Sequence, residues 1–290
     1  MKRLFVPDDV AVPYSGQDKN VRLLQYANAS TTENFDAFLT HHALVFILSG
    51  IKQINVSHSQ FRINAGELFL IPKGEYVMSE YIAGENGFQS IMLFFNRKVA
   101  CYVIEQLNET APETLAEVKK KEAIKIIPHN PEIHSLFHSL VSYSKENSPF
   151  LCEMVRLKFM ELIYLLLDGP YRKTIVSFLL DAARYETPSL TSVLEKYLYS
   201  SQTLEELAKL SGRSLSSFKR EFAQQYGEAP QTWIRKKKLE RAAFLLETSD
   251  KNIEEIAEAS GFISSAHFSR LFKEQYAKTP TAYRTEQTNI

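Results

Sequence analysis

The 290-residue sequence is poor in cysteine: it contains only Cys101 and Cys152, and neither belongs to a Cys-x-x-Cys pair. This scarcity excludes a disulfide scaffold and a thiolate zinc site. Long apolar runs are also missing, because the best one, residues 162–167, is far shorter than the roughly 20 residues of a membrane-spanning helix. The first residues, MKRLFVPDDV, have no apolar core of signal-peptide length. We therefore expect a cytoplasmic protein without membrane contact.

An excess of charge of either sign is missing as well. The sequence holds 34 Lys and Arg residues against 34 Asp and Glu residues, for a net charge of zero. Total charge therefore predicts no attraction to nucleic acid or membrane, and any binding of a polyanion must depend on the local placement of charge. The apolar content of 44% and the length are ordinary for a folded protein of two domains.

Signatures of catalysis are absent too. The sequence has no Gly-rich phosphate loop, no Gly-x-Ser-x-Gly elbow and no His-x-His pair. His41 and His42 are neighbours, so their side chains would point to opposite faces of a strand. His134 and His138 have the helical spacing of a metal-binding pair, but the edge of an amphipathic helix explains them without further ligands. We expect no enzyme activity, no metal and no cofactor.

The first 95 residues have the pattern of short strands. Their apolar segments are rich in β-branched and aromatic residues and are separated by turns that contain Gly, Pro or Asn, which predicts a small antiparallel barrel or sandwich. The clearest segments are residues 42–50, 52–58, 61–72 and 88–95.

Helical periodicity replaces this pattern from about residue 96. The clearest helix is predicted at 151–168, where apolar residues recur at helical spacing before a Gly-Pro stop. The Thr-Pro-Ser sequence that follows predicts a linker at 181–188. We thus expect a first domain over residues 1–180, with a barrel to about 95 and helices over 96–180.

The last part of the chain, residues 189–286, is predicted to be a separate all-α domain with short connections. The periodicity indicates seven helices, at 189–199, 204–210, 215–225, 230–247, 253–259, 265–275 and from 280.

A repeat lies inside this helical domain. Residues 204–213 read LEELAKLSGR and residues 253–262 read IEEIAEASGF. After one extra residue in the second copy, Phe218 and Phe222 align with Phe268 and Phe272. Each copy is a short helix, a turn with Gly and a second helix with a Phe-x-x-x-Phe seam, which is the helix-turn-helix arrangement. Two such motifs, at 204–225 and 253–275, predict a protein that places two helices on DNA.

These residues also carry a family resemblance. The segments LEELAKLSG, SFKREF, KKKLERAAFLL, IEEIAEASGF, HFSRLFKEQY and KTPTAYR closely resemble the C-terminal domain of AraC/XylS-type transcription regulators. Two departures stand out: Lys238 occupies a position where Arg is usual, and YAKTP (276–280) lacks the usual Gly of that turn. The segment 42–74, with GELFLIPKG, resembles the cupin-like N-terminal barrel of that family. FRINAGELFLIPKGEYVMSE is similar to the barrel of its type III secretion activators, which a partner protein controls.

The outward residues of the two recognition helices are the candidates for DNA contact. The resemblance places base readers at Ser216, Lys219 and Arg220 of the first helix and at Ser265, Ala266, His267 and Arg270 of the second. Arg and Lys suit the guanine edge, and Ala suits the thymine methyl group. Flanking positions and the basic run 235–238 add phosphate contacts. The additional residues are Ser214, Ser217, Lys236, Lys238, Ser264 and Lys273.

The N-terminal domain is predicted to sense a signal and to form a dimer, as the resemblance implies. Apolar barrel residues either enclose a small organic effector or simply fill the core; the candidates are Phe46, Phe69, Ile71, Phe88, Met92 and Phe94. The helix at 151–168 either contacts a second copy or packs only on the barrel; its candidate dimer residues are Met154, Val155, Phe159, Leu162, Ile163 and Leu166.

The sequence therefore predicts a two-domain transcription regulator, an activator, whose two recognition helices enter successive major grooves of double-stranded DNA. By resemblance its partners are RNA polymerase and an effector molecule or a regulatory protein. Two rival interpretations remain: a ligand-binding or metal-dependent cupin whose helical domain does not bind DNA, and a protein-interaction module. Neither rival requires two matched recognition helices.

Overall fold

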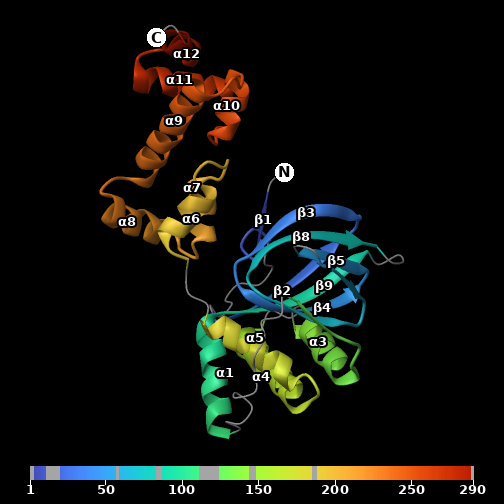
Figure 1. The fold of residues 1–290 in the computed structure, drawn as a ribbon. Coiled ribbons are helices and arrows are strands. Elements are labelled where there is room, and N and C mark those ends of the chain that lie inside the picture. Colours follow the sequence, from blue (N-terminus) through green and yellow to red (C-terminus); the bar gives the residue numbers. More distant parts are fainter. Residues whose placement is uncertain are drawn as a thin grey trace. The chain divides into compact units, whose positions relative to one another are not determined.

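The chain forms two compact units, residues Met1–Tyr185 and Glu186–Ile290. The computed structural model describes residues 3–10, 20–56, 59–82, 87–110, 124–143, 148–184 and 188–288. Figure 1 shows strands and helices in the first unit and helices in the second. Within the described residues, no helix is both long and apolar enough to cross a membrane.

Two five-stranded sheets form the barrel of the first unit. Their strand orders are β1-β3-β8-β5-β6 and β10-β7-β4-β9-β2. Every pairing is antiparallel except that of β1 with β3. The strands are β1 (Leu4–Val6), β2 (Val21–Asn28), β3 (Thr32–Leu39), β4 (His42–Ser49), β5 (Ile51–Val56), β6 (Ser59–Asn64), β7 (Leu68–Ile71), β8 (Gly74–Tyr81), β9 (Phe88–Phe95) and β10 (Lys125–Ile127).

The second sheet is buried on both faces, which explains why β4 is an unbroken apolar run. Its residues Ala43, Val45 and Ile47 point into the barrel, whereas Leu44 and Phe46 belong to the cluster formed with the helices. Successive side chains of a strand point to opposite faces, so both faces need apolar residues here. The covering helices lie together on one side of the barrel (Figure 1): α1 (Arg97–Thr110), α3 (Pro131–Tyr143), α4 (Leu151–Asp168) and α5 (Arg172–Arg184).

The predicted dimer helix corresponds to α4, and its apolar stripe faces inward. Five of the six candidate dimer residues are buried in the core of their own unit: Val155, Phe159, Leu162, Ile163 and Leu166. The prediction that these five contact a second copy is therefore wrong, because α4 needs them to pack on the barrel and on its neighbouring helices. Met154 is partly exposed.

Two predicted boundaries of the first unit also need correction. The linker predicted at 181–188 starts too early, since α5 continues to Arg184 and Ala182 is buried in the core. The barrel does not end near residue 95, because β10 pairs with β7 and places Ile127 in the core. Both errors arise where contacts distant in sequence decide the local structure.

The second unit contains all seven predicted helices. They are α6 (Leu190–Tyr197), α7 (Leu204–Leu210), α8 (Leu215–Tyr226), α9 (Pro230–Thr248), α10 (Ile253–Ala259), α11 (Ser265–Tyr276) and α12 (Pro280–Thr288). The helix α9 connects the two helix-turn-helix motifs, α7–α8 and α10–α11 (Figure 1). Its 19 residues correspond to roughly 28 Å of helical rise.

The sequence repeat is also a structural repeat, which includes the helix caps and the contacts between aromatic rings. The helices α7 and α10 each begin with a capping box, Thr203 with Glu206 and Asn252 with Glu255. Both turns use a glycine with positive φ, at Gly212 and Gly261. The aromatic chains also correspond, because the ring centroids of Phe222 and Tyr226 and those of Phe272 and Tyr276 are both 4.5 Å apart.

The two copies differ at the end of the recognition helix. The first ends at Gly227 with φ +77°, whereas the second ends at Ala277 with φ +60°. The left-handed conformation costs a non-glycine residue roughly 1–2 kcal/mol. Part of this is offset because glycine gains more freedom in the unfolded chain.

We expect Ala277→Gly to stabilise the C-terminal unit by about 0.5–1 kcal/mol. Urea unfolding followed by the fluorescence of Trp233, the single tryptophan of the chain, measures this change. The matched control is Gly227→Ala, which we expect to destabilise by a similar amount, because a Cβ there meets no atom within 4 Å and only the backbone conformation is penalised. Equal stability of Ala277→Gly and the wild type would contradict the assigned strain.

Candidate nucleic-acid interface

The first recognition helix, α8, has one buried and one exposed face. Phe218 and Phe222 are fully buried, while Ser216, Lys219 and Arg220 are exposed. Ser214 is the N-cap, and its Oγ accepts a hydrogen bond of 3.2 Å from the backbone N–H of Ser217. The exposed face therefore begins at a helix N-terminus, where backbone N–H groups and the helix dipole favour an anion such as phosphate.

The second recognition helix, α11, repeats this arrangement. Phe268 and Phe272 are fully buried, and Ser264 is the N-cap that accepts a 3.3 Å hydrogen bond from the N–H of His267. Arg270 is 67% exposed, and its Nη1 lies 3.8 Å from a carboxylate oxygen of Glu274, one turn away. The remaining candidates are exposed or partly exposed: Ser265, Ala266, His267 and Lys273.

Ser214 and Ser264 thus have a structural role as helix caps, whereas the sequence predicted only DNA contact for them. Each hydroxyl oxygen already satisfies a backbone donor of the first helical turn. Ser214 Oγ also lies 3.0 Å from the hydroxyls of both Ser216 and Ser217. The three serines therefore form a hydrogen-bonded group at the N-terminus of α8.

The basic run on α9 splits into two kinds of residue. Arg235 and Lys236 are exposed, and Lys237 forms a 2.7 Å ion pair with Glu240, whose hydrogen bond raises the pKa of Lys237. Lys238 differs, because its Nζ donates to two backbone carbonyls of the protein at 2.8 Å, those of Ser200 and Gly261. The prediction that Lys238 contacts DNA phosphate is therefore wrong in this structure, since both hydrogen bonds direct its ammonium into the domain.

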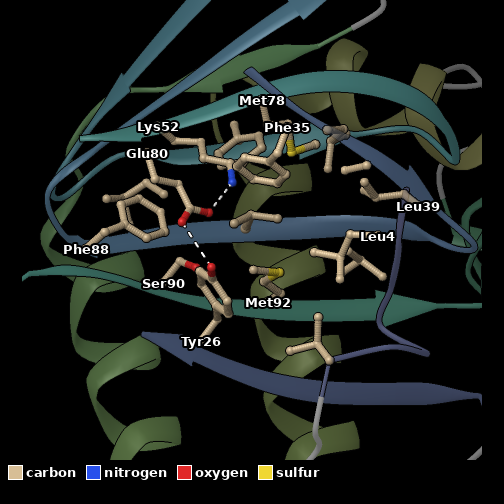
Figure 2. A pocket seen from close by; sticks show the side chains of 17 residues that line it. Leu4, Tyr26, Phe35, Leu39, Lys52, Met78, Glu80, Phe88, Ser90 and Met92 are labelled. Carbon is tan, nitrogen blue, oxygen red and sulfur yellow. Dashed lines mark hydrogen bonds and ion pairs between the residues drawn. The ribbon is translucent and has the colours of Figure 1, made fainter. Parts of the chain in front are cut away.

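A cavity lies inside the barrel of the first unit (Figure 2). Four of the predicted effector residues line it: Phe69, Ile71, Phe88 and Met92. Phe46 does not, because it points out of the barrel and stacks on Phe137 of α3 at 4.8 Å, so this part of the prediction is wrong. Phe94 is buried in the interior cluster but does not line the cavity.

One side of this cavity is polar, which the sequence analysis missed. Lys52 Nζ lies 2.6 Å from Glu80 Oε1, and Tyr26 donates a 3.0 Å hydrogen bond to Glu80 Oε2 (Figure 2). Burial lowers the pKa of Lys52 and raises the pKa of Tyr26. Ser90 Oγ is buried and has no hydrogen-bond partner within the described residues.

A signal for this ion pair was present in the sequence. Lys52 alternates with Ile54, and Glu80 alternates with Met78, so each charge stands at an inward position of its strand. The strands β5 and β8 pair with Lys52 directly opposite Glu80. A charge at an inward strand position needs a partner, and the register supplies one.

The candidate histidine pair contributes no metal centre within the described part of the chain. The ring centroids of His134 and His138 are 4.2 Å apart, and His134 packs edge-on against Phe46. No group of three or more potential ligands gathers among the described residues. The pair lies on α3, at an edge that is partly open to solvent.

Comparison with known proteins matches both units. Residues 42–178 match the family described as the ExsA N-terminal regulatory domain, and residues 207–286 match a helix-turn-helix domain. The HTH-type transcriptional regulator ExsA of Pseudomonas aeruginosa is 24% identical over 82% of this chain and 84% of its own. The virulence regulon transcriptional activator VirF of Yersinia enterocolitica is 27% identical over 48% of this chain and 51% of its own. Among solved structures, ToxT of Vibrio cholerae is similar over 93% of this chain and 98% of its own, with 14% identity and a TM-score of 0.44.

The repeated motifs and these matches define a two-domain, DNA-binding transcription regulator with an N-terminal regulatory domain. These matches agree with the resemblance to AraC/XylS-type regulators that the sequence shows.

Proposed function

We propose that this regulator binds one DNA site with two recognition helices, α8 and α11, that enter successive major grooves. The observation that carries the proposal is the structural repeat, in which both helices bury a Phe-x-x-x-Phe seam and expose a polar and basic face. A motif that served only for packing would not need matched exposed faces at both positions. An α-helix fits the major groove, and successive grooves on one side of B-DNA are about 34 Å apart.

In this proposal the exposed side chains divide between base reading and phosphate contact. Arg220 and Arg270 have the planar donors that suit guanine, and Lys219 supplies a further cation next to Arg220 in α8. Ala266 suits a thymine methyl group. The remaining proposed base readers are Ser216, Ser265 and His267. The proposed phosphate contacts come from the two N-caps, from Ser217, from the last turn of α11 and from α9, namely Ser214, Ser217, Ser264, Lys273 and Lys236.

The experiment that tests the proposal is fluorescence anisotropy of the full chain on its own upstream DNA and on a scrambled duplex of the same length. We expect preferential binding to the upstream DNA and an affinity that falls steeply as salt rises, because bound phosphates release counterions. Footprinting of the bound duplex then defines the operator. The proposal would be contradicted by DNA binding that does not depend on salt, or by the absence of binding to every duplex taken from the upstream DNA.

We propose further that the N-terminal unit controls this DNA binding, and that the protein acts as an activator in the cytoplasm by contacting RNA polymerase rather than as an enzyme. The names of the relatives, which are regulators and activators, support this role. The cavity has a volume of about 40 Å³, room for a few water molecules. An organic effector would therefore have to widen the barrel, which favours control by a protein partner.

A homodimer remains part of the proposal, with a corrected surface. The outward face of α4 exposes Leu157 at 64% and Tyr164 at 47%, and both line a groove with Tyr102 of α1, which is 52% exposed. Large exposed apolar side chains grouped around one groove are typical of a contact surface. The inward stripe of α4 takes no part.

We expect Leu157→Glu to weaken self-association by about tenfold or more, because it places a charge at the centre of this surface. Sedimentation equilibrium of the full chain measures the change. Glu161→Gln, on an exposed part of the same helix and outside the groove, is the matched control and is expected to leave self-association unchanged. A wild-type chain that stays monomeric at all concentrations would remove the dimer from the proposal.

A further inference from the structure

One side chain of α9 hydrogen-bonds to both halves of the DNA-binding unit. Lys238, near the middle of α9, donates one 2.8 Å hydrogen bond to the carbonyl of Ser200 and another to the carbonyl of Gly261. Ser200 lies between α6 and α7, next to the first motif. Gly261 lies in the turn between α10 and α11, inside the second motif. The ammonium group therefore contacts backbone from both halves of the DNA-binding unit.

This contact is built into the domain rather than being a surface accident. Lys238 is partly buried, and burial lowers its pKa. Its neighbour Lys237 instead bonds to a carboxylate on the same helix. The orientation of this ammonium group is more restricted than that of an exposed lysine. If it turned away from either carbonyl, a partly buried polar group would lose its hydrogen-bond partner.

The glycine of the second turn makes the contact sterically accessible. At Gly261 an added Cβ would lie 2.9 Å from Lys238 Nζ and 2.7 Å from the backbone carbon of Tyr199. The segment between α6 and α7 and the turn between α10 and α11 therefore approach each other more closely than a residue with a side chain at position 261 permits. Gly261 also has φ +82°, a conformation that favours glycine.

We propose that Lys238 is a positioning residue that sets the separation and angle of α8 and α11, and thereby the spacing between the two DNA segments the protein recognises. The inference rests on the proposed two-groove binding. The first motif packs on Trp233 of α9, whereas the second packs on the later part of that helix, from Leu239 to Leu246. A rotation of one half about α9 is therefore opposed by the contacts between the halves, and the two hydrogen bonds of Lys238 are the directional contacts among them. Removing the ammonium frees that rotation without touching either recognition face.

The first test needs no DNA. In a full-length Cys101→Ser, Cys152→Ser background, spin labels at the exposed positions Gln224 of α8 and Gln275 of α11 report the distance between the recognition helices. We expect one narrow distance distribution for the wild type, for Lys237→Met and for Lys238→Arg, whose guanidinium retains donors for both carbonyls. Lys238→Met is expected to broaden or shift the distribution. An unchanged distribution in Lys238→Met overturns the inference.

The second test uses the footprinted operator, in which α8 and α11 are each proposed to recognise one DNA segment. The two segments are moved apart or together by one and two base pairs. For the wild type we expect a change of the spacing by one base pair to lower the affinity about tenfold, which is comparable to the typical cost of one mismatched base pair. Lys238→Met is expected to lose most of this discrimination, whereas Lys237→Met and Lys238→Arg keep it. Wild-type discrimination in Lys238→Met overturns the inference.

The two tests separate the inference from the proposed function. If the wild type ignores operator DNA, the proposed function fails while the distance measurement still decides the role of Lys238. Trp233 fluorescence monitors whether each variant is folded. Should Lys238→Met not fold, Lys238→Gln, which retains an amide donor without charge, is measured in its place by both tests.

Discussion

Glu80→Ala is expected to destabilise the N-terminal unit by about 3–5 kcal/mol, the typical cost of breaking a buried ion pair from one side. The Lys52 ammonium then remains inside the barrel without its carboxylate, only 7% exposed and surrounded by Phe35 and Phe88. Tyr26 loses its acceptor in the same change, and the Asn28 amide keeps only its hydrogen bond to Thr32.

The pH dependence of this variant has a defined sign. Burial already lowers the pKa of Lys52, and Glu80 is the group that opposes this effect. Without Glu80 the pKa falls further below its value in the unfolded chain. When the pKa of a lysine is lower in the folded protein than in the unfolded chain, its charged form destabilises the fold. This penalty is largest at a pH below the folded-state pKa and shrinks as the pH rises from the folded-state pKa to the unfolded-state pKa. Glu80→Ala should therefore recover stability as the pH is raised from neutral toward about 10.

Hydrogen exchange of β5 and β8 peptides across a urea titration measures this stability within the full chain. Trp233 lies in the C-terminal unit, so its fluorescence is the internal control and should not change. Glu75→Ala is the matched variant, because the Arg3–Glu75 pair at 3.2 Å is partly exposed and is expected to contribute at most about 1 kcal/mol. A loss for Glu80→Ala no larger than that for Glu75→Ala would refute the assigned role of the pair.

Arg220→Ala and Arg270→Ala are each expected to weaken binding to the footprinted operator by about 1–3 kcal/mol, the usual contribution of a bidentate contact to guanine. Both side chains are exposed at corresponding positions of α8 and α11. Arg270 must leave its 3.8 Å contact with Glu274, but an exposed pair at this distance offers little resistance.

Arg→Lys variants at the same positions separate base reading from phosphate contact. Lysine keeps the charge but loses the planar fork, so Arg220→Lys should lose specific affinity while keeping the salt dependence. If the contact is to phosphate instead, Arg220→Lys binds like the wild type and Arg220→Ala lowers the salt slope by about one. Anisotropy on the operator and on the scrambled duplex provides both quantities. Wild-type binding by both folded Ala variants would refute the placement of the recognition helices.

The helical half of the chain was largely predictable because its signals are local. Helix propensity, caps and the 3.6-residue period act over one or two turns, so the repeat at 204 and 253 predicted both motifs and their exposed faces. Lys238 is the exception. Its place in the basic run predicted a phosphate contact, yet its partners, Ser200 and Gly261, lie 38 and 23 residues away in sequence.

The barrel half was predictable only in outline. Strand periodicity assigns alternate residues to opposite faces, but β4 and β9 are apolar on both faces, so their sequences do not reveal which face lines the cavity. Phe46 and Val45 are adjacent and both buried, yet they belong to different clusters. The apolar stripe of α4 was ambiguous in the same way, because the barrel and a second copy would select the same residues.

The sequence by itself therefore determined the class of this protein, since the two matched helix-turn-helix motifs depend on local patterns that occur twice in the same order. Only the tertiary structure decided which buried faces meet, that Lys52 pairs with Glu80, and that Lys238 points inward toward the carbonyls of Ser200 and Gly261. The physical reason is that burial and ion pairing are properties of pairs of surfaces, and those surfaces come together from distant parts of the chain only when it folds.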